Sequence, residues 1–239
     1  MALVNSSVSR REALGLLGAA ALAAVAAACG GGSSDSAASS SRKRSTGSSG
    51  STSGASCVLT SEMTEGPYYI DGEAVRSNIT EGKPGMPLRL DLTVVDADTC
   101  QPIPGASVEV WHADATGNYS GFGSATSNRT FLRGVQIADD DGTVTFDTLY
   151  PGWYQGRAVH IHLKAHKGGN QVHTTQLFFD ENVSDAVYMT SPYNSRSGQR
   201  TTNAQDNIYA DGGTQSTLAL AKNGDGYVGT LTLGIRTSV

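Results

Sequence analysis

Residues 151–162 read PGWYQGRAVHIH, and this stretch decides both the fold and the site. The Pro-Gly pair predicts a turn, and the alternating apolar residues after it predict a β-strand. Because side chains alternate between the two faces of a strand, Val159 and Ile161 point to one face. His160 and His162 therefore share the other face, where both imidazoles can reach one metal ion.

The histidine pair alone does not identify a metal site. One partly buried and one hydrogen-bonded histidine explain it equally well, and imidazole also suits zinc, copper and nickel. Two tyrosines narrow the choice, although most of the nine tyrosines are expected to be ordinary packing aromatics. Tyr154 lies just before the strand and Tyr119 lies in a glycine-containing loop. A phenol, with a pKa of about 10, binds only an ion acidic enough to remove its proton, which favours Fe(III).

Apolar residues in the rest of the chain fall in short alternating runs, which are typical of a β-rich fold. Strands are predicted over residues 88–94, 107–112, 131–138, 143–146, 159–163, 174–179 and 229–235, and one short helix over 181–189. Polar, glycine-containing segments separate them, and Asp139 to Gly142 predicts a tight turn. We therefore expect an all-β domain, an antiparallel β-sandwich with long loops.

The first 29 residues have the features of an export signal. Arg10 and Arg11 precede an uncharged run that ends at Ala28 and is shorter than the roughly 20 residues of a membrane span. The paired arginines are similar to a twin-arginine signal, and the end of the run is similar to a bacterial lipoprotein cleavage site. Residues 1–29 are predicted to be a signal peptide, with Cys29 as the lipid-bearing residue. A plain secretory signal with a chance cysteine is the alternative.

Residues 30–56 consist almost entirely of Gly, Ser, Ala and Thr. Such a segment cannot bury a core, so it is predicted to be a disordered tether in front of a catalytic domain at 57–239. The net charge of −5 argues against a nucleic-acid partner. The membrane attachment that we expect is a lipid on Cys29, which would hold an exported domain outside the cell or at its surface.

Two cysteines lie in the predicted domain, Cys57 and Cys100. In an oxidising compartment they are expected to form a disulfide, whereas two unpaired, half-buried thiols are the alternative. The predicted export favours the disulfide, which the chain-entropy account values at about 4 kcal/mol.

The motif formed by Pro151 to Tyr154, Arg157, His160 and His162 resembles the signature of the intradiol ring-cleavage dioxygenases, which include catechol, hydroxyquinol and protocatechuate dioxygenases. The resemblance extends over most of residues 64–179. Its further motifs are Thr64–Tyr68, Val108–Trp111, Gly117–Tyr119, Phe131–Gly134, Asp141-Gly142 and Thr175–Leu177. The chain is most similar to the small exported members, which lack the helical N-terminal dimerisation region.

This resemblance implies a prealbumin-like β-sandwich that carries a non-haem Fe(III) centre. The implied iron ligands are Tyr119, Tyr154, His160 and His162. Arg157 would stabilise charge on the substrate, and Gln176 would lie near the iron. Pro67 and Tyr68 would line the substrate pocket, or form a plain structural turn. The implied substrates are a small aromatic diol and O₂, and the product is a cis,cis-muconate. Loops at 66–70 and 191–199 are expected to form pocket walls.

Two other functions are compatible with part of the chain. Residues 91–154 also resemble non-catalytic, prealbumin-like modules that serve as cell-surface binding or spacer domains, but such modules do not account for Arg157 together with His160 and His162. A zinc or copper enzyme would use the histidines but leaves the tyrosines unexplained. The three other histidines, His112, His166 and His173, are expected to be structural or exposed. The sequence carries no prediction of oligomeric state.

Overall fold

The computed structural model describes residues 57–236. The predicted signal peptide at 1–29, the lipid site at Cys29 and the tether at 30–56 lie outside these residues. Within the described chain, no helix is both long enough and apolar enough to cross a membrane.

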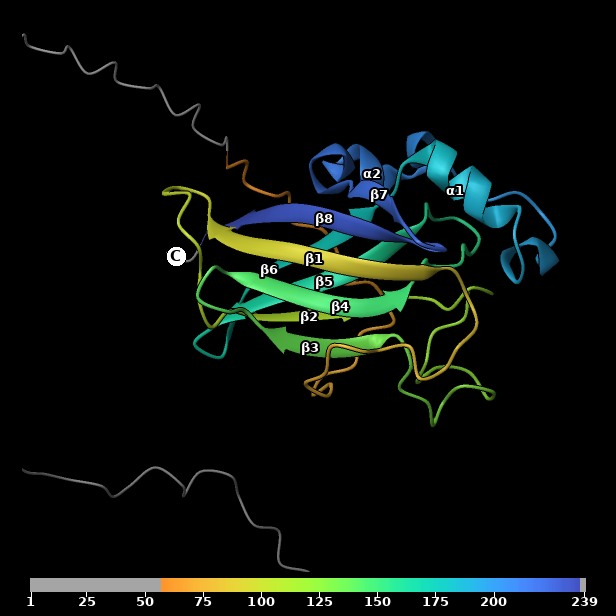
Figure 1. The fold of residues 1–239 in the computed structure, drawn as a ribbon, viewed down its shortest axis with the longest axis horizontal. Coiled ribbons are helices and arrows are strands. Elements are labelled where there is room, and N and C mark those ends of the chain that lie inside the picture. Colours follow the sequence, from red (N-terminus) through yellow and green to blue (C-terminus); the bar gives the residue numbers. More distant parts are fainter. Residues whose placement is uncertain (1–56, 237–239) are drawn as a thin grey trace, which may run out of the picture. The chain divides into compact units, whose positions relative to one another are not determined.

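Two four-stranded sheets pack face to face (Figure 1). The β1 sheet has the strand order β4 (Thr143–Leu149), β1 (Pro87–Asp96), β8 (Gly226–Ile235) and β7 (Ala219–Asn223). The β5 sheet has the order β3 (Arg133–Ile137), β2 (Ser107–Trp111), β5 (His160–Lys167) and β6 (Asn170–Phe178). The expected all-β sandwich is therefore confirmed.

One strand pair differs from the expected antiparallel arrangement. Strands β1 and β8 run parallel, with Leu88 opposite Tyr227 and Asp96 opposite Ile235. These strands come from the two ends of the domain, so no hairpin dictates their relative direction, and the prediction of a wholly antiparallel sandwich was wrong here. Strand β7, which pairs with β8, was not predicted because its residues are mostly exposed and do not alternate cleanly between apolar and polar.

The core lies between the two sheets and determines which face of the β5 sheet carries the site. Leu88, Leu90 and Leu92 of β1 belong to the same buried cluster as Ile161 and Leu163 of β5. Burial of each such side chain contributes about 1.5–3 kcal/mol. Because the alternate residues of β5 face this core, His160 and His162 must point to the outer face of the β5 sheet, and loops bury them there.

Short helical pieces follow β6. Helix α1 (Glu181–Tyr188) confirms the predicted helix and is capped by Asp180, whose side chain accepts from two backbone amides. The loop-rich part contains η1 (Tyr193–Ser195), η2 (Asn203–Gln205), α2 (Asn207–Ala210) and η3 (Gly213–Ser216).

The beginning of the described chain is held to the sandwich by a disulfide between Cys57 and Cys100, whose Cα atoms lie 5.5 Å apart. The Thr60 amide then donates to the carbonyl of Gly234, at the end of β8. Strand β3 starts two residues later than predicted because Leu132 has a left-handed φ of 57°, which breaks the extended backbone.

Candidate functional site

Four side chains predicted from the sequence meet on the outer face of the β5 sheet. Tyr154 Oη lies 3.0 Å from His160 Nε2, which lies 3.1 Å from His162 Nε2. Tyr119 Oη lies 3.5 Å from Tyr154 Oη, and the Tyr119 and His162 rings are 6.1 Å apart at their centroids. These residues, which we call the tyrosine-histidine cluster, come from one strand and two separate loops.

One buried aspartate organises both tyrosine-bearing loops. Asp114 Oδ1 accepts from the amides of Thr116 and Asn118, which shapes the turn before Tyr119. The Asp114 carbonyl accepts from the Gly152 amide at 3.0 Å, two residues before Tyr154. A Cβ on Gly152 would lie 2.3 Å from that carbonyl oxygen, so the approach requires glycine. Sequence reasoning missed Asp114, because its partners are mostly backbone amides.

The hydrogen bonds of His160 determine which ring nitrogen is free. Its Nδ1 lies 2.6 Å from the Ala158 carbonyl, which can only accept, so Nδ1 carries the proton of the neutral ring. Nε2 therefore presents a lone pair to the cluster, the arrangement commonly found in metal-binding histidines. His162 stacks on Trp111 at 4.9 Å and 5°, and its Nδ1 is buried with no hydrogen-bond partner among the described residues.

Burial controls the protonation of all four groups. It raises the pKa of the Tyr119 phenol well above its ordinary value and also raises the pKa of Tyr154. Burial, helped by the Arg157 guanidinium, lowers the pKa of His160 to about 3 and lowers the pKa of His162 as well. At neutral pH the imidazoles are neutral, and the phenols keep their protons unless a strongly polarising cation joins them.

The donor set fits a hard, highly charged metal ion. Protein ligands lie about 2 Å from a bound transition metal, which places neighbouring donors about 3 Å apart, as in the cluster. Within residues 57–236, no three His, Cys, Asp or Glu side chains form a group that could hold a metal. The two phenols are therefore what completes the histidine pair, and phenolate oxygen suits Fe(III) better than it suits the softer divalent ions.

The two predicted catalytic residues lie beside the cluster and contact each other. Gln176 of β6 is directly opposite His162 in the sheet, and the Arg157 Nη2 donates to its side-chain oxygen. The Gln176 amide nitrogen in turn donates to the Thr64 carbonyl at 2.8 Å. A residue that the sequence did not reveal, Asp206, accepts from Arg157 Nε at 2.9 Å.

The two predicted pocket residues have different environments. The Tyr68 ring stacks on Tyr119 at 4.3 Å and 16°, whereas Pro67 is exposed. Tyr68, Tyr119 and Phe122 line a cavity of 210 Å³ between their loops. Gly66, which precedes Pro67, lies over the His162 ring, because a Cβ on Gly66 would be 3.1 Å from that ring.

The Ser191–Gln199 loop was also predicted to form a pocket wall. In the structure it lines a separate cavity that contains Trp153 and none of the four cluster residues. Its Arg196 donates to the Thr116 carbonyl and so supports the Tyr119 loop from outside. Instead, the segment that carries Asp206 contacts a predicted site residue, Arg157.

The other three histidines stand apart from the cluster. His112 is buried and bonds to Thr148 Oγ1 at 2.7 Å, and His166 is half-buried. His173 is buried, and burial lowers its pKa to about 4. The Glu62 carboxylate lies 3.5 Å from its Nδ1 but is largely exposed, so burial dominates. These positions agree with structural roles.

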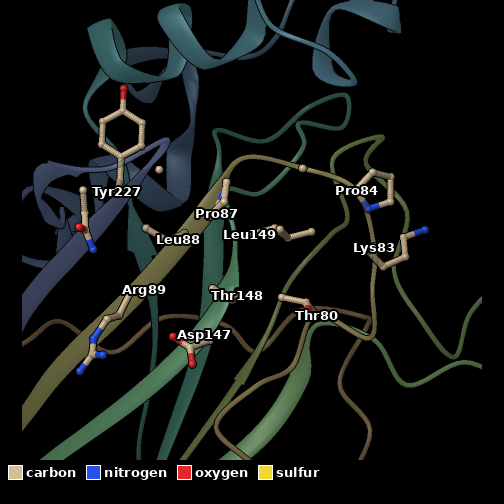
Figure 2. Close-up of a pocket in the computed structure, with 13 residues that line it drawn as sticks. Thr80, Lys83, Pro84, Pro87, Leu88, Arg89, Asp147, Thr148, Leu149 and Tyr227 are labelled. Carbon is tan, nitrogen blue, oxygen red and sulfur yellow. The ribbon is translucent and has the colours of Figure 1, made fainter.

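A larger hollow, of 550 Å³, lies on another part of the domain (Figure 2). Its wall includes Arg89, Asp147 and Tyr227, and it contains no member of the tyrosine-histidine cluster. Lys83, which also lines it, reaches Asp114 with its ammonium at 2.7 Å. The hollow therefore has no direct part in the chemistry of the cluster.

Comparison with known proteins agrees with this geometry. The family model described as Dioxygenase matches residues 64–216, a range that includes the whole cluster, Arg157 and Gln176. The chain belongs to the intradiol ring-cleavage dioxygenase family. Among solved structures, this chain is similar to an intradiol ring-cleavage dioxygenase from Tetranychus urticae, with 40% identity and a TM-score of 0.73. That match covers 75% of this chain and 95% of the other.

Two further relatives belong to bacteria. The dioxygenase domain of a dioxygenase carbohydrate-binding protein fusion from Streptomyces sp. SirexAA-E is 28% identical, with a TM-score of 0.61, over 76% of this chain and 100% of that domain. Chlorocatechol 1,2-dioxygenase from Rhodococcus opacus is 30% identical over 149 residues, which are 51% of this chain and 56% of that protein. The chain thus spans about half the length of the curated relatives that it matches.

Proposed function

We propose that this protein is a ferric dioxygenase that cleaves a catechol-type ring between its two hydroxyl groups, with a cis,cis-muconate as product. The observation that carries the proposal is the convergence of two phenol oxygens and two imidazole nitrogens at spacings of 3.0–3.5 Å. Family membership supports the reaction type, and the donor chemistry supports the metal.

Tyr119, Tyr154, His160 and His162 would hold the iron. A diol that chelates Fe(III) held by these residues would become reactive towards O₂. The protein's contribution is to keep the His160 Nε2 atom free of a proton and to bring both imidazole Nε2 atoms close to the phenol oxygens. The Ala158 carbonyl does this for His160, and stacking on Trp111 fixes the plane of the His162 ring.

The remaining residues handle protons and charge. A diol gives up two protons when it chelates a metal, and the Tyr154 Oη, which is less buried than Tyr119, is the side-chain group placed to accept one of them. The Arg157 guanidinium would stabilise the negative charge that develops on the ring as O₂ attacks. Gln176 fixes the outer end of that guanidinium.

Two alternatives account for less of the structure. A non-catalytic surface module would have no use for four convergent donors buried beside a guanidinium. A zinc or copper enzyme on the same histidines gives no reason for two phenols to complete the set. The zinc or copper enzyme predicts that changing a tyrosine hydroxyl leaves the metal site intact, and the surface module predicts no bound metal.

The test is to purify the chain from iron-replete cells and measure iron content and colour. We expect about one Fe(III) per chain and a red-brown colour from phenolate-to-iron charge transfer, which Tyr119→Phe and Tyr154→Phe should each change. Tyr227→Phe is the matched control, since Tyr227 lies outside the cluster. Catechols under O₂ should yield muconates. A colourless, iron-free protein, or a ring opened outside the diol, would overturn the proposal.

We further propose that the protein is exported and anchored through Cys29. The disulfide between Cys57 and Cys100 supports export, because such bonds persist in oxidising compartments. Cell fractionation of the full chain should find it with membranes, and Cys29→Ser should release it. Cytoplasmic protein with free thiols would contradict the proposal.

A further inference from the structure

Asp206 is a buried carboxylate with no part in the proposed metal site. Its side chain is 1% exposed, and it is the first residue before the short helix α2. Burial alone would raise the pKa of Asp206, but the Ala158 amide and the Arg157 guanidinium outweigh that effect and lower it. It is therefore a buried negative charge.

The two oxygens of Asp206 serve different parts of the chain. Oδ1 accepts from the amides of Ile208 and Tyr209 at 2.8 and 3.4 Å, which ties the carboxylate to α2. Oδ2 accepts from Arg157 Nε at 2.9 Å and from the Ala158 amide at 2.7 Å. The carboxylate thus joins α2 to the loop that leads into β5.

These bonds and the contact with Gln176 restrain Arg157 at two different nitrogens. Its Nε is held by Asp206 and its Nη2 by the Gln176 side chain, and Gln176 is itself held by the Thr64 carbonyl. Two bonds to different nitrogens fix both the position and the plane of a guanidinium. Arg157 is 20% exposed, so without a restraint its side chain could turn towards solvent.

We propose that Asp206 is the positioning residue for Arg157, holding its guanidinium at the edge of the tyrosine-histidine cluster where charge develops on the substrate. The proposal rests on the proposed ring-cleavage function. The hydrogen bonds of Asp206 go to Arg157 and to three backbone amides and not to the four cluster residues, so Asp206 acts through Arg157.

The same contacts explain why an aspartate is required. All four partners of the Asp206 oxygens are N–H donors. Asparagine has one oxygen and one NH₂ group, so whichever way it is turned, its NH₂ would face N–H donors. Asp206→Asn therefore keeps the size of the side chain but breaks one half of the connection.

The experiment measures kcat and KM for catechol with the full-length, iron-loaded chain. Asp206→Asn should lower kcat tenfold to a hundredfold, as expected when a catalytic group is misplaced by about 1 Å, while KM changes less than threefold. The charge-transfer colour should stay, because the four ligands are untouched. Asp180→Asn is the matched control: Asp180 caps α1 in the same way but has no bond to Arg157, so its activity should equal wild type.

A double-mutant cycle separates positioning from general structural damage. If Asp206 acts through Arg157, the variant that combines Arg157→Gln with Asp206→Asn should be no less active than Arg157→Gln alone. Multiplicative losses, or an Asp206→Asn kcat within twofold of wild type, would overturn the proposal.

Arg157→Lys tests the same restraint if Asp206→Asn fails to fold. A single ammonium cannot reproduce the two-point hold of a guanidinium, so kcat should again fall tenfold or more, and near-normal activity would overturn the proposal. If wild type cleaves no catechol, the proposed function fails. The positioning role is then judged from crystal structures of Asp206→Asn, or of Arg157→Lys if the former does not fold. The Arg157 guanidinium, or the ammonium that replaces it in Arg157→Lys, should have left Gln176, and an unchanged contact would refute the role.

Discussion

Replacing Arg133 with methionine should destabilise the domain more than any surface change. Arg133 is 1% exposed and donates to Ser120 Oγ at 2.9 Å, to the Ser120 carbonyl at 2.8 Å and to the Tyr68 carbonyl at 2.7 Å. Its guanidinium lies 5.9 Å from the centre of the Tyr119 ring. Arg133 therefore fixes Ser120, which follows the predicted ligand Tyr119. It also fixes Tyr68, whose ring stacks on Tyr119.

The size of the loss follows from these contacts. Methionine keeps most of the volume but leaves three buried acceptors without a donor, each costing about 1–3 kcal/mol, less any bond that water restores. The Glu73 carboxylate, 3.8 Å from Arg133 Nε, would also lose its buried partner. Removing one member of such a buried pair costs about 3–5 kcal/mol in other proteins. We therefore expect Arg133→Met to lower the free energy of unfolding by about 3–5 kcal/mol.

Urea unfolding of the full chain measures this loss, and iron content with visible absorbance measures the consequence for the site. Arg89→Met is the control, because Arg89 is half exposed and its ion pair with Asp91 lies on the surface, so it should change stability by less than about 1 kcal/mol. A loss below about 1 kcal/mol for Arg133→Met, with unchanged colour, would refute the reasoning.

Three further predictions concern separate parts of the domain. Replacing Cys57 and Cys100 with serine removes a cross-link between residues 43 positions apart and should cost about 4 kcal/mol in chemical unfolding; equal unfolding midpoints would contradict this. Because burial lowers the pKa of His173 to about 4, its neutral form stabilises the fold above about pH 6.5, and this contribution is lost as the pH falls towards 4. His173→Gln should flatten the pH dependence of unfolding over that range by up to about 3 kcal/mol, and an unchanged slope would count against it. Gly66→Ala forces a side chain into a φ of +70° and against the His162 ring, so it should cost about 1–2 kcal/mol and reduce the iron content of the purified protein; full iron occupancy with wild-type stability would argue against this.

Local periodicity explains why much of the site could be predicted. Strand alternation alone places His160 and His162 on one face, and the structure has them there because Ile161 and Leu163 face the core. The pairing of Tyr119 with Tyr154 was predicted from the metal chemistry of phenols and from a family resemblance. The structure brings their hydroxyls to 3.5 Å across 35 positions of sequence.

The contacts between distant segments could not be predicted from the sequence. Asp206 lies 49 positions from Arg157 in a stretch without periodicity, and its role depends on how the chain returns over β6. The parallel pairing of β1 with β8 and the burial of Arg133 have the same origin. Such contacts are decided by how remote segments of the chain meet in the tertiary fold, which no local pattern encodes.

The sequence by itself therefore determined the all-β class and, through the family resemblance, the four candidate ligands, because strand period, donor chemistry and motif spacing are all properties of the sequence. Only the tertiary structure decided what holds those ligands and Arg157 in place. Asp114, Arg133 and Asp206 each join segments that are remote in the chain. A buried charge of this kind can be recognised only when its partners are in contact with it.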